Sequence, residues 1–255
     1  MAGQAVRAEA AGGQGLLVLR GVTKRFGGLV AVQGVSFAVA EGETVGLIGP
    51  NGAGKTTLFN VITGAVAPEG GEIRLGGERI DGLRPHEIAQ RGVRRTYQIV
   101  RPFPNLSLLD NVLIGSLFGG TGRAGEAARE RAREMLAFVG LTDKAAMLAR
   151  DLNLAEKKKL ELARALASGP QLLLLDEVLA GLNPVEIDRS LALLAEIKGR
   201  LGTTIVMVEH VMRAVLRVSD RVVVLHQGEK IAEGRPEVVA GDPRVIEAYL
   251  GERVG

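Results

Sequence analysis

The stretch Gly49-Pro50-Asn51-Gly52-Ala53-Gly54-Lys55-Thr56 decides the fold. It matches the pattern G-x-x-x-x-G-K-[ST], it follows the apolar run Thr44–Ile48, and it opens a helical pattern at Lys55. A strand, a glycine-rich loop and a helix in this order present main-chain amides and a helix N-terminus to an anion. We therefore predict a phosphate-binding loop. The alternative is a glycine-rich turn that merely links a strand to a helix.

The residue types of this loop suit a phosphate chain that approaches the backbone closely. Glycines remove side chains that would block the approach, so that successive N–H groups face the anion. Lys55 is predicted to reach the β and γ phosphates, and Thr56 to place its hydroxyl on a Mg²⁺ ion that bridges them. The same loop supplies the other predicted contacts, from Asn51, Gly52, Ala53, Gly54 and Thr57.

A pair of carboxylates follows an apolar strand later in the chain. Leu172–Leu175 leads directly into Asp176 and Glu177, and open α/β sheets bind ligands at the carboxyl ends of their strands. We predict that Asp176 holds Mg²⁺ through a water molecule and that Glu177 is the general base for the attacking water. The alternative, acids that simply cap a helix, loses weight because the phosphate-binding loop lies upstream.

Other polar residues stand where strands are expected to end. The apolar run Thr204–Val208 leads into Glu209 and His210. We expect the neutral imidazole of His210 to hydrogen-bond the γ-phosphate, with a structural or solvated histidine as the alternative. Glu209 is interpreted as a surface charge. Gln98 lies where the sheet passes into a helical region, and on position alone we expect its amide to meet the metal or the water.

Composition limits the chain to one domain of ordinary size. Its 255 residues, 46% of them hydrophobic, suffice for one α/β core with a smaller appended lobe. The net charge of +3, from 32 basic and 29 acidic residues along the whole chain, predicts no nucleic-acid partner. The absence of cysteine excludes disulfides and thiol catalysis and fits a cytoplasmic protein. No run of about 18 apolar residues is available to span a membrane.

Short β-type runs alternate with amphipathic stretches from Leu16 onward, which is typical of a largely parallel sheet covered by helices. The predicted strands are Leu16–Arg20, Val35–Val39, Thr44–Ile48, Glu72–Leu75, Leu172–Asp176, Thr203–Val208 and Arg221–Leu225. Helices are predicted to begin at Lys55, Pro85, Pro184 and Val211. Between about Gln98 and Leu166 the sequence shows only helical periodicity. The predicted helices there are Leu108–Leu117, Glu126–Val139, Asp143–Ala149 and Ala155–Ala167. We therefore predict one domain at 16–255, with a core of 16–97 and 167–255, a helical subdomain at about 98–166, and a disordered tail at 1–15.

These motifs, and their order, resemble those of the ABC ATPase family from Leu16 to Glu252. The resemblance implies a P-loop NTPase fold with a mostly parallel sheet, a small antiparallel β region and an inserted helical subdomain, and it implies hydrolysis of ATP with Mg²⁺. It assigns family roles to the Walker A loop at 49–56, the Q-loop Gln98, Walker B at Leu172–Asp176, the catalytic Glu177 and the switch His210. It also places the ring of Phe26 against adenine, with an ordinary core phenylalanine as the alternative.

Residues 95–104, 180–184 and 248–252 resemble one branch of the family, the ATPases of branched-chain amino acid importers. The signature segment departs from the family's Leu-Ser-Gly-Gly-Gln, because residues 152–156 read Leu-Asn-Leu-Ala-Glu. In the family this segment contacts the γ-phosphate held by the opposite subunit. Asn153 can still donate a hydrogen bond, but Ala155 adds a methyl group and Glu156 a negative charge, so we expect a weakened site. The run Lys157–Lys159 is interpreted as a solvated helix face, with a positive field near the phosphate as the alternative.

The resemblance also implies partners and a location. Two cassettes of the family pack head to tail around ATP, so we expect a second ATPase subunit, transmembrane permease subunits that contact the groove near Gln98, and indirectly a substrate-binding protein. We expect the chain at the cytoplasmic face of the inner membrane, where it powers import of branched-chain amino acids. The alternatives are another cargo (urea, amides or lipopolysaccharide), a soluble ABC ATPase acting on ribosomes or DNA, and a regulatory module without turnover.

Overall fold

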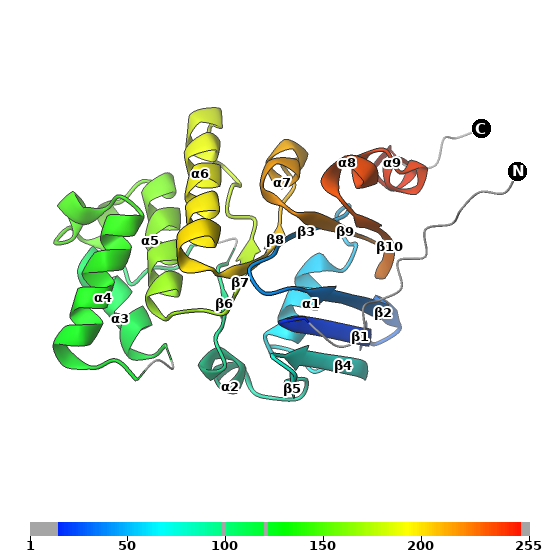
Figure 1. The fold of residues 1–255 in the computed structure, drawn as a ribbon, viewed down its shortest axis with the longest axis horizontal. Coiled ribbons are helices and arrows are strands. Elements are labelled where there is room, and N and C mark those ends of the chain that lie inside the picture. Colours follow the sequence, from blue (N-terminus) through cyan, green and yellow to red (C-terminus); the bar gives the residue numbers. More distant parts are fainter. Residues whose placement is uncertain (1–14, 98–99, 120–121, 251–255) are drawn as a thin grey trace, which may run out of the picture.

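The computed structural model describes residues 15–97, 100–119 and 122–250, and these form two β-sheets with helices around them (Figure 1). The larger sheet contains β3 (Thr44–Ile48), β6 (Val93–Arg95), β7 (Leu172–Asp176), β8 (Thr204–Val208), β9 (Arg221–His226) and β10 (Glu229–Gly234). Its order is β10-β9-β3-β8-β7-β6, and only the β9/β10 pair is antiparallel. The smaller, antiparallel sheet contains β1 (Leu17–Phe26), β2 (Leu29–Val39), β4 (Gly70–Leu75) and β5 (Glu78–Arg79).

Helices cover both faces of the larger sheet. They are α1 (Lys55–Ile62), α2 (Pro85–Gln90), α3 (Leu108–Leu117), α4 (Gly125–Phe138), α5 (Leu154–Ala167), α6 (Pro184–Leu201), α7 (Met212–Val218), α8 (Pro236–Ala240) and α9 (Pro243–Leu250). Figure 1 shows α1 between the two sheets, α6 and α7 on the opposite face of the larger sheet, and α3 to α5 gathered at one end. This arrangement confirms the predicted α/β fold with a mostly parallel sheet, a small antiparallel β region and a group of inserted helices.

Alternate residues of the central strands pack into two separate hydrophobic cores, one on each face of the larger sheet. Leu172 and Leu174 of β7 pack with α1 and the antiparallel sheet, whereas Leu173 and Leu175 pack with the helices of the other face. A strand buried on both faces must be apolar throughout, which explains why β3, β7 and β8 read as unbroken apolar runs. These buried strands fix where the sheet ends and therefore where the polar residues that follow them lie.

One predicted helix, Asp143–Ala149, is wrong. The structure has two short 3₁₀ turns there, Thr142–Lys144 and Ala149–Asp151. The carbonyls of Ala145 and Met147 instead accept the N–H groups of Leu109 and Leu108, the first residues of α3. Tertiary hydrogen bonds that cap the start of α3 thus replace the local helical ones.

Three strands were missed because their local patterns are weak. β5 and β6 are only two and three residues long, and each contains arginine. β10 reads Glu-Lys-Ile-Ala-Glu-Gly and lies at a sheet edge, where both faces need not be apolar. The short β6 matters most, because it brings Arg95 beside the end of β7.

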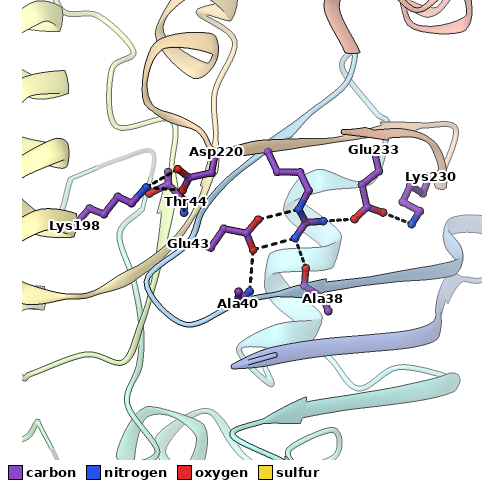
Figure 2. A network of polar contacts seen from close by, with 9 residues as sticks. Ala38, Ala40, Glu43, Thr44, Lys198, Asp220, Lys230 and Glu233 are labelled. Atoms are coloured by element: carbon purple, nitrogen blue, oxygen red, sulfur yellow. Dashed lines mark hydrogen bonds and ion pairs between the residues drawn. The ribbon is translucent and has the colours of Figure 1, made fainter. Parts of the chain in front are cut away.

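A network of charged residues ties together the amino-terminal ends of the parallel strands β3 and β9 (Figure 2). Asp220 accepts the N–H of Thr44 at 2.8 Å and is paired with Lys198 at 2.6 Å. Arg221 is paired with Glu43 at 2.8 Å and also with Glu233. Since the strands run away from this network, it stabilises the sheet edge opposite to the one at which the glycine-rich loop lies.

Candidate functional site

The loop at residues 49–56 joins β3 to α1 and packs so tightly that two of its positions admit only glycine. Gly49 has φ +149°, and a Cβ there would lie 2.0 Å from the carbonyl oxygen of Leu225 in β9. Gly54 has φ +101°, and its Cβ would lie 2.4 Å from the carbonyl oxygen of Ala31 in β2. Both conformations and both contacts exclude a side chain. The two glycines therefore allow the loop to pack closely against β9 of the larger sheet and β2 of the smaller one. Helix α1 begins directly after Gly54.

Lys55 lies buried under this loop at the start of α1. Its Nζ donates to the carbonyl oxygens of Gly49 at 2.6 Å and Pro50 at 2.9 Å. Burial lowers the pKa of the Lys55 ammonium, and the nearby charges of Glu177 and Asp176 act in the opposite direction. The lysine thus lies close to the carboxylates of Asp176 and Glu177 at the end of β7.

The other predicted contact residues of the loop and of the first turn of α1 differ in exposure. Asn51, Gly52 and Thr56 are exposed, Thr57 is half-buried and Ala53 is buried. The Thr56 hydroxyl belongs to the first turn of α1, where main-chain N–H groups have no helical partner. This end of the helix therefore offers both amide donors and a hydroxyl to a ligand.

Asp176, the last residue of β7, is buried and paired with an arginine that the sequence did not single out for a role. Arg95 of β6 donates from Nη2 to Asp176 Oδ2 at 2.6 Å, and the two side chains are 7% and 6% exposed. The Arg95 guanidinium also donates to Asn60 at 2.6 Å and lies over the rings of Phe59 and Tyr97. The only signal in the sequence was the place of Arg95 just before Gln98, since its partner lies far along the chain.

Glu177 and His210 form a contact across two neighbouring strand ends. His210 Nε2 lies 2.7 Å from Glu177 Oε1, with the imidazole 44% and the carboxylate 14% exposed. Glu177 adopts φ +51°, which is rare for a residue other than glycine. The two predicted residues are therefore brought together, and they lie at the edge of the sheet where Asp176 and the glycine-rich loop lie.

Glu209 is not the surface charge that we predicted. It is 2% exposed, and its carboxylate accepts the N–H of Leu179 at 2.8 Å. Burial raises the pKa of Glu209 to about 7, although that hydrogen bond and the charge of Lys158 oppose the rise. The prediction failed because tertiary packing buries the Glu209 carboxylate. The identity of a residue does not reveal whether other parts of the chain pack over it.

The run Lys157–Lys159 is not simply a solvated helix face either. All three lysines are half-buried. Lys158 Nζ donates to the main-chain oxygens of Glu177 at 3.1 Å and Val178 at 2.9 Å. Burial lowers the pKa of the Lys158 ammonium, while the charges of Glu209, Glu161 and Glu177 oppose this.

The unusual signature segment forms a reciprocal cap at the start of α5. Asn153 Oδ1 accepts the N–H of Glu156 at 2.9 Å, and Glu156 Oε2 accepts the N–H of Asn153 at 3.2 Å. Lys144 binds the other oxygen of Glu156 and, as the largest cause, lowers the pKa of that carboxyl. Ala155 is half-buried in the first turn. The negative charge of Glu156 is thus paired within the chain.

Two predicted residues stand apart from this cluster. Phe26, at the end of β1, is 47% exposed, and Lys24 Nζ lies 5.1 Å from the centroid of its ring. The alternative of an ordinary core phenylalanine is therefore wrong. Gln98 lies outside the described residues, as do residues 1–14 of the predicted tail.

A six-stranded, mostly parallel sheet with this loop and these acids at one edge defines a nucleotide-binding P-loop ATPase. The profile of the ABC transporter family matches residues 32–180, and that of a branched-chain amino acid ATP-binding cassette transporter matches residues 229–255. The chain belongs to the ABC transporter family, and it is an ATP-binding ATPase of that class. Among the described residues, none of the helices is both long and apolar enough to cross a membrane.

Two relatives are similar to this chain over nearly its whole length. The high-affinity branched-chain amino acid transport ATP-binding protein BraF of Pseudomonas aeruginosa is 43% identical over 93% of this chain and 98% of its own length. The corresponding protein LivG of Escherichia coli K12 is 42% identical over 94% of this chain and 99% of its own length. The chain is therefore similar to these proteins throughout, beyond its motifs.

Solved structures are similar at the level of the whole fold. The ADP conformation of an ATP-binding cassette of an ABC transporter has a TM-score of 0.84 and 32% identity, over 94% of this chain and all of that one. A dimeric post-hydrolysis cassette bound to ADP and Pi has a TM-score of 0.77 and 28% identity, over 86% of this chain and 98% of that one.

Proposed function

We propose that this chain hydrolyses ATP with Glu177 as general base and thereby powers import of branched-chain amino acids. The observation that carries the catalytic part is the 2.7 Å contact between Glu177 Oε1 and His210 Nε2 at the edge of the sheet that holds the loop. A general base must be held in place by a neighbour if its oxygen is to face the reacting water. The cargo is proposed from the similarity to the two transport proteins named above.

The residues at this edge fit a magnesium-bound triphosphate. Gly49 and Gly54 allow the loop to turn tightly against neighbouring main-chain oxygens, and the hydroxyl of Thr56 and the carboxylate of Asp176 are the hard oxygen donors that Mg²⁺ prefers. Bound Mg²⁺ would neutralise charge on the β and γ phosphates. We propose further phosphate contacts from the loop, namely from Asn51, Gly52, Ala53, Gly54, Lys55 and Thr57.

In the proposed mechanism, Lys55 exchanges the two loop carbonyls that it now contacts for phosphate oxygens. Glu177 accepts the proton of the attacking water. The single N–H of the neutral His210 imidazole holds the Glu177 carboxylate before the nucleotide binds and is shared with a γ-phosphate oxygen once it is bound. Gln98 is proposed to contact the metal or the water from the segment between β6 and α3. The exposed ring of Phe26 is free of the core and is proposed to stack on adenine.

We also propose a division of the chain into a core of residues 16–97 and 167–255 and a helical subdomain at about 98–166. The described part of residues 98–166 contains helices and turns but no strand of either sheet. Its helices share one apolar cluster with Leu173 and Leu175 of β7, so the two parts pack as a single domain.

The proposed partners are a second cassette, two permease subunits and, indirectly, a substrate-binding protein, with the chain at the cytoplasmic face of the inner membrane. The dimer of a related cassette with ADP and Pi supports the first of these. A groove of about 390 Å³ supports the permease subunits as partners, because it combines cationic and aromatic side chains suited to a permease loop. Its lining includes Arg94, Arg101, Phe103, Phe118 and Arg164. We propose that Asn153 and Ala155 face the nucleotide of the second cassette.

The proposed function is tested on the complex reconstituted from this chain, the permease subunits and the second cassette. Glu177→Gln is expected to slow ATP hydrolysis by about 10² to 10⁴-fold and to keep Mg-ATP binding. Uptake of leucine, isoleucine and valine into vesicles, compared with urea and short amides, tests the cargo. Unchanged turnover in Glu177→Gln would reject the catalytic assignment, and uptake of urea alone would reject the cargo.

A further inference from the structure

The main chain just after β7 adopts a conformation that needs support. Glu177 has φ +51°, and among the described non-glycine residues only Gln227 shares a positive φ. A left-handed residue with a side chain is strained, and such conformations persist only where surrounding contacts hold them. The direction of the Glu177 carboxylate, and hence its 2.7 Å contact with His210, depends on this backbone conformation.

Contacts from β8, from the residue that follows it and from α5 hold this segment. The N–H of Glu177 donates to the carbonyl of Val208 in β8 at 2.9 Å. Two residues further on, the N–H of Leu179 donates to the buried carboxylate of Glu209 at 2.8 Å. The carbonyls of Glu177 and Val178 both accept from the Nζ of Lys158, which comes from α5.

Lys158 therefore spends two of its three N–H donors on main-chain oxygens beside the proposed general base. A half-buried ammonium loses hydration, and acceptors that replace water must be held at hydrogen-bonding distance. Its neighbours provide a comparison. Within the described part of the chain, neither Lys157 nor Lys159 makes a side-chain hydrogen bond or ion pair.

We propose that Lys158 is a positioning residue for ATP hydrolysis: it fixes the main chain at Glu177 and Val178 and so aims the Glu177 carboxylate. This inference rests on the proposed function, in which Glu177 is the general base. Lys158 lies in the second turn of α5, and Asn153 caps the same helix. A displacement of the signature end of α5 is therefore passed directly to the main chain that carries the general base.

A purely structural role is the competing explanation, because the charge of Lys158 also opposes those of Glu209 and Glu161. The two roles predict different results in a protein that lacks the Glu177 carboxylate. A structural lysine affects folding whatever residue stands at 177. A positioning lysine acts through the Glu177 carboxylate, so its effect on hydrolysis disappears once that carboxylate is gone.

The experiment measures single-turnover ATP hydrolysis and Mg-ATP affinity of the reconstituted complex. The variants are Lys158→Met, the matched control Lys157→Met, Glu177→Gln, and Lys158→Met combined with Glu177→Gln. Lys158→Met is expected to slow hydrolysis by about 10- to 100-fold, the scale of a small misplacement of a catalytic group, and to leave the Kd for Mg-ATP within about 2-fold. Lys157→Met is expected to match the wild-type rate.

In the Glu177→Gln background, Lys158→Met is expected to cause no further loss. An equal loss in both backgrounds, or a wild-type rate in Lys158→Met, overturns the proposal. If Lys158→Met does not fold, Lys158→Gln takes its place with the same criteria. Should Glu177→Gln itself hydrolyse ATP normally, the proposed function fails; should only the lysine variants be silent, the proposed function stands and this inference fails.

Discussion

Replacing Glu209 by Gln should make the protein more stable at alkaline pH. The buried carboxyl of Glu209 has a pKa of about 7, against an ordinary value of 4.5. Glutamine keeps an oxygen that can accept the N–H of Leu179, and it removes the ionisation. The charge, and not the hydrogen bond, is therefore what the substitution changes.

The direction in which the free energy of unfolding changes with pH follows from proton binding at Glu209. Between pH 4.5 and about 7 the folded protein binds a proton at Glu209 that the unfolded chain has released. The free energy of unfolding therefore falls as the pH rises through this window and is constant, as far as Glu209 is concerned, above it. One pKa unit corresponds to about 1.4 kcal/mol, so Glu209 should account for a loss of about 2–3 kcal/mol between pH 4.5 and pH 8.

Urea unfolding followed by far-UV circular dichroism measures this, since the chain has no tryptophan. The quantity of interest is the change in unfolding free energy between pH 5 and pH 8, compared between wild type and Glu209→Gln. The wild type should lose about 2 kcal/mol more than the variant. The exposed Glu247, changed to Gln, is the control and should follow the wild type. Equal pH dependence in all three proteins would refute the reasoning.

Three further changes test the loop, the buried ion pair and the signature. Gly54→Ala should abolish tight Mg-ATP binding in calorimetry, because the added Cβ would lie 2.4 Å from a main-chain oxygen. Arg95→Met should lower the free energy of unfolding by about 3–5 kcal/mol in urea titrations, since it leaves Asp176 buried and unpaired, and Asp176→Asn in the same chain should recover part of the loss. Asn153→Ser with Ala155→Gly should raise ATP turnover of the complex; no change or a loss would show that the native signature suits its site.

The fold was predictable where a residue's neighbours along the chain set its environment. β3 and β7 have the predicted bounds, because a strand buried on both faces must be apolar and must end where polar residues begin. The start of α6 at Pro184 after the cap Asn183 was predictable for the same local reason. The segment Asp143–Ala149 was not, because the N–H groups of α3 determine its conformation.

The site shows the same limit. The motifs located the glycine-rich loop, Asp176, Glu177 and His210, since each follows an apolar strand. Arg95 was missed because its partner Asp176 is 81 positions away in sequence. Lys158 was misinterpreted because its partners are main-chain oxygens, which carry no residue type to recognise.

These missed residues share one physical task. An ion or a strained main chain buried beside the proposed nucleotide site is costly unless a partner is already in place. Arg95 from β6 pairs the Asp176 carboxylate, and Lys158 from α5 binds the carbonyls that follow it. Groups that are fixed before the nucleotide arrives need not reorganise during hydrolysis. We therefore expect any movement of α5 or β6 relative to β7 to change the ATPase rate, even where it touches no atom of the nucleotide.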